Sequence, residues 1–299
     1  MKRILSLAGG GTRGVLQAEY LNALQNDLSK PLVDYFDIFS GTSVGGINVL
    51  CLVNAKMSTE QVVGLYADDI VNTIFDKSIF DKVLGMAQPV PQFDGKGKLS
   101  VLQKYMKDIE LGDTSKMVLI PAYNVSYMKP KFFKTTNVAD KGIKIYEIAN
   151  ATSAAPVYFP PHFVDDAYYC DGGVFCNLPV LPAYAEFRGG YGFNEEVKVL
   201  SIGTGELIPE FHKLVETAEN MGGVSWLRQG LLDMMMDIKK DVKIMYNMLG
   251  DNYFHLDFIV PENNFAMDNP EKRNIDELKH IAKAEYISSR DRVLSFLGV

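Results

Sequence analysis

Several features that define common protein classes are scarce in this sequence of 299 residues. Its three cysteines, Cys51, Cys170 and Cys176, form no CxxC pair, so the thiols fit a reducing compartment or buried positions better than a disulfide framework. Positive charge is in the minority, with a formal net charge of −7, whereas a nucleic-acid backbone is held by clustered lysine and arginine. A nucleic-acid partner is therefore not expected.

Long apolar runs are missing as well. The longest run beyond the N-terminus, 47–55, contains Asn48 and Asn54 and falls far short of the roughly 20 residues that span a bilayer. The apolar stretch 4–8 is too short for a signal peptide, and no small-residue cleavage site follows it. We expect a protein without a transmembrane segment, located in the cytoplasm and peripheral to the membrane when it acts there.

The apolar pattern predicts an α/β protein. Strand, glycine turn and helix occur twice in succession, first over 3–8, 9–14 and 15–28, and then over 35–39 and 44–53. This order is typical of a largely parallel central sheet with flanking helices. Composition is ordinary for a globular protein, with 47% hydrophobic and 22% charged residues. We expect a single domain over 1–299, with a motif-bearing core over 2–205 and a helical part over 206–299. Further strands are expected at 117–122, 131–135 and 197–202, and the glycine-containing stretch 94–100 is interpreted as a loop.

The motif Gly41-Thr42-Ser43-Val44-Gly45-Gly46 lies where a predicted strand gives way to a predicted helix. A nucleophile elbow requires this context, because small residues on either side of the serine let the chain turn sharply and expose the hydroxyl. The N-terminal amides of the following helix favour negative charge at the same place. The alternative interpretation is a helix that starts with glycine and serine.

A second glycine motif, Gly9-Gly10-Gly11-Thr12-Arg13-Gly14, has two interpretations. It satisfies the dinucleotide pattern GxGxxG, with Asp34 about 20 residues downstream. It also suits an oxyanion hole, in which consecutive amides face a developing negative charge. Asp34 precedes the next apolar run instead of closing it, and that run leads into the serine motif. The oxyanion hole is therefore favoured.

A serine nucleophile needs a base, and none of the four histidines lies in a loop typical of a catalytic histidine. His162 is the best of them, and the other three are His212, His255 and His280. Asp171 is followed by Gly172 and Gly173, which permit close backbone approach to the acid. A carboxylate is a weak base in water, so Asp171 would have to be held close to the serine and partly desolvated.

Three blocks, GGGTRG, GTSVGG and DGG, occur in this order and together resemble the patatin-like phospholipases. Further agreement is found in ATSAAPVYFPP (151–161), in Asn177 and Pro179, and in SIGTG (201–205). The resemblance covers about 2–205 and continues more weakly through 226–256. It implies a three-layer patatin-like fold and a Ser–Asp dyad in place of a triad.

The resemblance also assigns roles by position. It implies that Ser43 is the acylated nucleophile and that Asp171 activates it. The oxyanion hole falls on Gly9, Gly10, Gly11 and Val44, where Gly10 and Gly11 supply amides, Gly9 shapes the turn and Val44 assists. Supporting positions are Arg13, Gly14, Gly41, Gly45, Gly172 and Gly173. Ala8 departs from the aspartate that many relatives have there. No metal and no cofactor are implied.

The expected function is hydrolysis of fatty acyl esters in membrane phospholipids or galactolipids through an acyl-serine at the bilayer surface. The alternative is a catalytically idle patatin-like protein that serves in storage or interaction, and a dinucleotide-binding oxidoreductase is the third hypothesis. The apolar stripe over 227–249 is interpreted as core or subunit contact, which would allow a homo-oligomer. The segment 74–93 is a candidate lid, with Phe75, Ile79 and Phe80 expected to contact lipid or line the acyl entrance. A loop-rich decoration packed on the core is its alternative.

Overall fold

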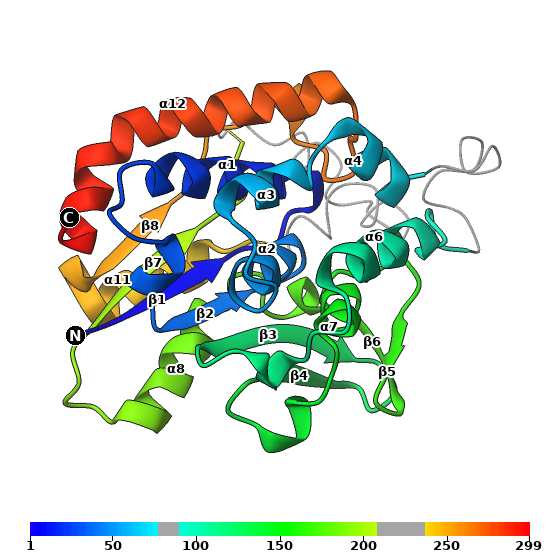
Figure 1. Cartoon of the computed structure of the whole chain (residues 1–299), viewed down its shortest axis with the longest axis horizontal. Helices are drawn as coiled ribbons and strands as arrows, with labels where there is room; N and C mark the ends of the chain where they lie inside the picture. Colours follow the sequence, from blue (N-terminus) through cyan, green and yellow to red (C-terminus); the bar gives the residue numbers. More distant parts are fainter. Residues whose placement is uncertain (77–89, 208–236) are drawn as a thin grey trace, which may run out of the picture.

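The computed structural model describes residues 1–76, 90–207 and 237–299. Most of the candidate lid and the first part of the apolar stripe lie outside these residues. The described part is a mixed α/β structure in which helices cover both faces of a central sheet, as predicted (Figure 1).

The described residues form one sheet of eight strands, in the order β5-β6-β3-β2-β1-β7-β8, with β4 also paired to β3. The strands are β1 (Lys2–Leu7), β2 (Ile38–Gly41), β3 (Met117–Asn124), β4 (Lys129–Lys134), β5 (His162–Val164), β6 (Ala167–Asp171), β7 (Val197–Ile202) and β8 (Tyr253–Leu256). The pairs β1–β2, β1–β7, β2–β3 and β7–β8 are parallel. The pairs that involve β4, β5 and β6 are antiparallel, so the parallel centre ends in an antiparallel corner.

This antiparallel corner brings the C-terminal ends of β2 and β6 close together. Leu119 of β3 pairs with both Ser40 of β2 and Lys134 of β4, whereas Ala122 pairs with both Lys131 of β4 and Asp171 of β6. Because β4 occupies one edge of β3 throughout, β2 and β6 must share the other edge. Strand β2 runs parallel to β3 and β6 runs antiparallel to it. Their C-terminal ends therefore converge beside the middle of β3.

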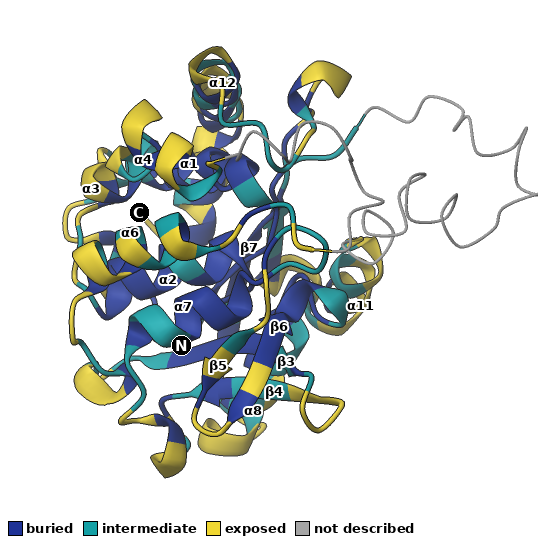
Figure 2. Cartoon of the chain, turned by 90° about the vertical axis from the view of Figure 1, so that its right-hand side faces the viewer, coloured by how far each residue is buried: buried dark blue, intermediate teal, exposed yellow. Residues whose placement is uncertain are grey.

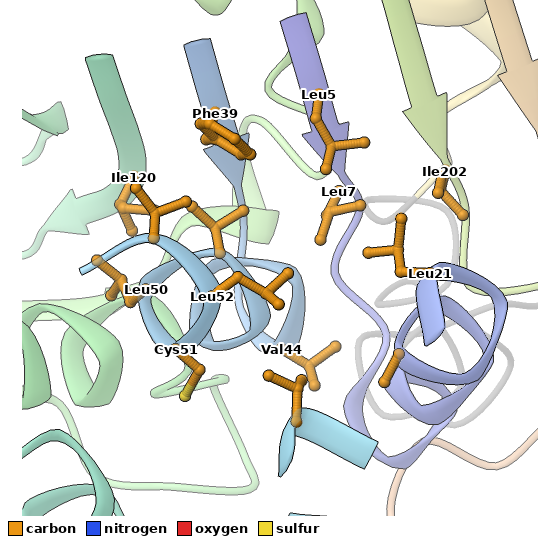
Figure 3. Close-up of a cluster of buried hydrophobic side chains, with 14 of the residues drawn as sticks. Leu5, Leu7, Leu21, Phe39, Val44, Leu50, Cys51, Leu52, Ile120 and Ile202 are labelled. Carbon is orange, nitrogen blue, oxygen red and sulfur yellow. The ribbon is translucent and has the colours of Figure 1, made fainter. Parts of the chain in front are cut away.

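Two hydrophobic clusters lie on opposite faces of the sheet. Along β1, Ile4 belongs to one cluster, whereas Leu5 and Leu7 belong to the other. Successive side chains of a strand point to opposite faces, and both faces here are covered, so apolar side chains of β1 point to both sides of the sheet. Figure 3 shows the larger cluster, in which helices α1 (Gly14–Gln25) and α2 (Val44–Val53) pack against β1, β2 and β3.

The smaller cluster joins the other face to α8 (Val180–Tyr191) and α11 (Lys239–Leu249). Burial follows these layers, with the central strands buried between helices whose outer sides are exposed (Figure 2). The remaining helices are α3 (Thr59–Gly64), α4 (Asp68–Ile74), α6 (Lys96–Met106), α7 (Ile145–Thr152) and α12 (Lys272–Leu297). None of the helices in the described ranges combines the length and the hydropathy needed to cross a membrane.

The structure corrects two sequence predictions. The run 35–39 is not a strand over its whole length, because a 3-10 turn covers Leu32–Tyr35 and β2 begins at Ile38. The carboxylate of Asp37 accepts hydrogen bonds from Lys2 Nζ and Arg3 N, both at 2.9 Å, and so fixes the start of β2 beside β1. The second correction concerns 94–100, which is not a loop, because α6 starts at Lys96.

Gly97 explains why this helix was missed. A Cβ at Gly97 would lie 1.9 Å from the carbonyl oxygen of Thr73 in α4, so only glycine lets the two helices approach this closely. Glycine in a sequence usually indicates a loop, but Gly97 lies where α6 contacts α4.

Candidate active site

Ser43 lies on a sharp turn between β2 and α2. Its backbone has φ 55° and ψ −125°, a conformation that a non-glycine residue adopts only under strain. The turn is held because Thr42 Oγ1 donates to Cys176 O at 2.8 Å and Gly45 N donates to Thr42 O at 2.9 Å. A Cβ at Gly45 would lie 2.5 Å from Leu7 O, so glycine is required where the first turn of α2 meets the end of β1. Gly41 closes β2 on the other side of the elbow.

Thr152, at the end of α7, holds the backbone of the turn at Ser43 in place. Its Oγ1 accepts a hydrogen bond from Ser43 N at 3.0 Å and donates one to Pro121 O at 2.5 Å. Thr152 is fully buried, so these contacts are shielded from water. Because Pro121 lies in β3 between the points where β2 and β6 converge, Thr152 ties the serine to the middle of that strand.

Asp171 is the last residue of β6 and is 2% exposed. Its N–H donates to Ala154 O at 2.9 Å, and its Oδ1 accepts from Gly173 N at 2.7 Å. Gly172 and Gly173 form a 3-10 turn against β3. Oδ2 is buried and accepts no hydrogen bond of normal geometry from the described residues. A buried carboxylate oxygen without such a partner is rare and points to a functional role.

Burial raises the pKa of Asp171 from its ordinary value near 3.8 to about 6. The Ser43 hydroxyl, the Gly173 N–H and the Lys98 ammonium each favour the ionised form and limit the rise. A carboxyl group with a pKa near 6 is a stronger base than an exposed aspartate and is still ionised at neutral pH.

Ser43 and Asp171 line the same cavity. Most of the wall is apolar and comes from α2, α4 and α6 and from the segments beside them; its members include Ile47, Cys51, Leu65, Val71, Phe75, Leu102 and Met106. Phe75 stacks edge-on against Phe93, and both rings contact Phe159. Of the residues expected at the lid, Phe75 is thus at the cavity wall, whereas Ile79 and Phe80 lie outside the described residues. The apolar wall is chemically suited to a hydrocarbon chain.

The glycine loop after β1 borders the cavity, with Gly11 and Thr12 in its wall. The N–H groups of Gly10, Gly11 and Val44 have no acceptor among the described residues, so they are free for an oxyanion. The N–H of Gly9, by contrast, donates to both the carbonyl and the side-chain oxygen of Asn177 at 3.1 Å, so it is not available to an oxyanion. Gly9 retains a part in shaping the turn.

Buried polar side chains fix this loop to its neighbours. Thr204 Oγ1 donates to Gly9 O at 2.7 Å, and Gln17 Nε2 donates to Ala8 O at 2.9 Å and to Ile202 O at 3.0 Å. Asn48 Nδ2 donates to Gly14 O at 3.2 Å, where α1 begins. A network of this kind holds the amides in one orientation before substrate binds.

Arg13 is buried at 4% exposure and does not reach the cavity wall. Its guanidinium lies 3.9 Å from the ring centroid of Phe265, and Nη1 donates to Gly205 O at 3.4 Å. Arg13 therefore connects the glycine loop to the segment after β7.

The histidines in the described ranges lie away from the cavity. His162 contacts Glu147, His255 Nδ1 lies 2.7 Å from Ser201 Oγ, and His280 Nδ1 lies 2.7 Å from Asp276 O. None of these three lines the cavity that contains Ser43. His212 lies outside the described residues. The described residues also contain no group of three or more His, Cys, Asp or Glu side chains placed to hold a metal ion.

Two residues of the site were missed in the sequence. Thr152 carried no separate signal within the small-residue stretch that contains it. Lys98, which lines the cavity and is 3% exposed, lies in a stretch of glycines and lysines that reads as a solvated loop. Only the helix α6 turns this lysine inwards.

A family model described as patatin-like phospholipase matches residues 5–184. A cGAMP-activated phospholipase from Pseudomonas aeruginosa is 31% identical over 269 residues, which cover 85% of this chain and 77% of that protein. Patatin-like protein 1 from Arabidopsis thaliana is 27% identical over 336 residues, covering 94% of this chain and 80% of the relative.

Among solved structures, human GIVD cytosolic phospholipase A2 aligns over 99% of this chain and 58% of its own, with a TM-score of 0.49 and 11% identity. VipD from Legionella pneumophila aligns over 95% of this chain and 67% of its own, with a TM-score of 0.47 and 14% identity.

Proposed function

Because the chain belongs to the patatin-like phospholipase family, we propose that it is a carboxylic ester hydrolase that removes fatty acyl chains from membrane phospholipids or galactolipids. The observation that carries this proposal is the shared cavity of Ser43 and Asp171, whose remaining wall is largely apolar. Hydrolysis of an ester lipid needs a nucleophile, a base and an apolar channel for the acyl chain in the same site.

In the first step, Ser43 Oγ attacks the carbonyl carbon of the acyl ester and Asp171 accepts the serine proton. Burial gives Asp171 a pKa of about 6, so the carboxylate is ionised at neutral pH and basic enough to assist. The strained backbone at Ser43 keeps the hydroxyl directed out of the elbow.

The tetrahedral intermediate carries a negative oxygen, which the free N–H groups of Gly10, Gly11 and Val44 stabilise. Collapse of the intermediate breaks the ester bond, and the departing alcohol takes the proton from Asp171. The chain is then an ester of Ser43. Water attacks this acyl-serine with Asp171 again as the base, and the products are a free fatty acid and the regenerated serine.

The proposed site of action is the surface of a bilayer, where the acyl chain leaves the membrane for the cavity. The test is release of fatty acid from phosphatidylcholine and galactolipid vesicles, measured with wild type, Ser43→Ala and an unrelated surface variant. Because the bacterial relative is named for activation by cGAMP, each assay is run with and without this nucleotide. Fatty acid release by wild type but not by Ser43→Ala supports the proposal. Equal rates for the two proteins in both conditions contradict it and favour an idle storage or interaction protein.

A further inference from the structure

Lys98 is a buried ammonium group whose position none of the proposed steps explains. It lies on α6 with 3% exposure, and it shares the cavity wall with Ser43 and Asp171. Lysine is almost never fully buried without an ionic partner. No carboxylate of the described residues lies within ion-pair distance of Lys98. Asp171 lines the same cavity, and its charge favours the protonated lysine.

The hydrogen bonds of Lys98 show what holds it there. Nζ donates to Ser153 O at 2.8 Å, to Ser153 Oγ at 3.1 Å and to Asn150 O at 3.4 Å. These acceptors lie at the C-terminal end of α7, where a positive charge is favoured by the helix dipole. The ammonium also lies 4.1 Å from the ring centroid of Phe159. All three N–H donors are directed at protein groups, so Lys98 offers its charge to the cavity but no free donor for a lipid phosphate.

The segment that binds Lys98 also positions the base. Ala154, the residue after Ser153, accepts the backbone N–H of Asp171 at 2.9 Å. Two consecutive residues, Ser153 and Ala154, thus contact Lys98 and Asp171 respectively. A cation in a dry site stabilises a nearby carboxylate far more than it would in water.

We propose that Lys98 is a positioning residue for the proposed hydrolysis, whose buried charge keeps Asp171 ionised against the cost of its own burial. This inference rests on the proposed function. Burial raises the pKa of Asp171 and lowers that of Lys98 to about 7, and each charge partly offsets the shift of the other group.

The other titratable groups on the cavity wall do not supply this charge. They are Cys51 on α2, Tyr66 before α4, Tyr105 on α6, and Tyr158 and Asp268 in the connecting segments. Burial raises the pKa of Cys51 and of Tyr66, so both are neutral near pH 7. Asp268 Oδ2 accepts a hydrogen bond from Gln92 Nε2 at 3.0 Å, and a carboxyl group cannot carry a positive charge. Lys98 is the only cationic side chain among the described residues that line the cavity.

The first test is the pH profile of kcat/KM for a short soluble ester, p-nitrophenyl butyrate, with Lys98→Met, Lys98→Gln and Lys98→Arg. Lys104→Met, an exposed change on the same helix, is the control. Without the charge, the pKa of Asp171 rises and the acid limb moves to higher pH. A shift by one pH unit lowers kcat/KM about tenfold on the acid side. Lys98→Gln can still donate to Ser153 O, so it separates charge from hydrogen bonding.

The expected result is a shifted limb in Lys98→Met and Lys98→Gln and an unshifted limb in Lys98→Arg and Lys104→Met. If the acid limb of the pH profile stays in place in folded Lys98→Met or Lys98→Gln, the inference is overturned. A purely structural role of Lys98 would lower the rate without moving this limb.

A second test leaves Lys98 unchanged and does not depend on catalysis. The ¹³Cε resonance of Lys98 is followed against pH by NMR in Ser43→Ala and in Ser43→Ala/Asp171→Asn. We expect a lower pKa for Lys98 when Asp171 is neutralised, and equal values overturn the coupling. This arm remains decisive if the neutral Lys98 variants do not fold, or if the chain proves not to hydrolyse esters.

Discussion

Ser43 follows strand β2 and Asp171 ends strand β6, and these two strands run towards each other along the same edge of β3. Ser40 of β2 pairs with Leu119, and Asp171 of β6 pairs with Ala122, so the two strand ends are separated by the short central part of β3. The sheet itself therefore brings the proposed nucleophile and base together. Thr152 and Ala154 then fix the two backbones to this meeting point.

Asp171→Asn is expected to reduce ester hydrolysis to near background, because an amide cannot accept the serine proton. Asp166→Asn, in the exposed turn between β5 and β6, is the matched control and should keep wild-type activity. Initial rates with p-nitrophenyl butyrate check both. An Asp171→Asn enzyme with more than about a tenth of the wild-type rate would remove Asp171 from its proposed role.

The same change is expected to stabilise the protein at neutral pH. The folded-state pKa of Asp171 is raised from 3.8 to about 6, so the folded state binds this proton more tightly than the unfolded state does. The free energy of unfolding therefore falls as pH rises through this window. The loss amounts to about 3 kcal/mol for a shift of this size. Asparagine avoids it, so the difference in unfolding free energy between Asp171→Asn and wild type should grow from pH 4 to pH 7. Denaturant melts at both pH values measure this difference, and one that is constant with pH would contradict the proposed burial cost.

Wild-type kcat/KM is expected to fall on the acid side with a midpoint near pH 6, set by Asp171 in the free enzyme. Because His162 and His255 lie away from the cavity, alanine at either position should leave the midpoint in place. A histidine variant that is as inactive as Asp171→Asn, while folded by circular dichroism, would show that the base is a histidine.

Thr152→Val is expected to impair both stability and catalysis. The change removes the acceptor of the Ser43 N–H and leaves a buried donor unpaired, which costs about 1–3 kcal/mol. Thr136→Val removes a hydroxyl of similar size at an exposed site and serves as the control. Unfolding free energies and kcat are the readouts; a Thr152→Val protein that matches wild type in both would refute the anchoring role.

Cys51 provides a test of the acyl cavity. It lies on the side of α2 that faces away from the strands, at the cavity wall (Figure 3). Cys51→Phe should fill part of the cavity and slow hydrolysis of esters with long chains much more than that of the butyrate ester. Cys51→Ala should leave the ratio of the two rates near wild type. If both esters are slowed equally by Cys51→Phe, with an unchanged melting temperature, the acyl chain binds elsewhere.

The sequence was most informative where local chain geometry determines the structure. The elbow, the helix after it and the strands β1 and β7 follow from glycine placement and apolar runs, and the structure has them close to their expected positions. The position of Asp171 at the end of a strand was not foreseen, because β6 is short and its pairing with β3 involves residues far apart in sequence. The bond from the Gly9 N–H to Asn177 was not foreseen either, because it joins segments more than 160 residues apart.

The burial of Lys98 is a second feature that the local sequence could not predict. Its neighbours Lys96, Gly95 and Gly97 are typical of a solvated loop, and only the contact of Gly97 with Thr73 in α4 reveals a helix that turns Lys98 inwards. A buried charge is determined by packing between helices, which a local pattern does not contain.

The central claim is that Ser43 is the acylated nucleophile, and reaction with a fluorophosphonate tests it most directly. The serine oxygen attacks phosphorus, fluoride leaves, and the adduct stays on the side chain that reacted. Peptide mass spectrometry of the labelled wild type should place one adduct on Ser43, and Ser43→Ala with a normal circular dichroism spectrum should remain unlabelled. An adduct on another residue of the wild type, or equal labelling of Ser43→Ala, would contradict the account.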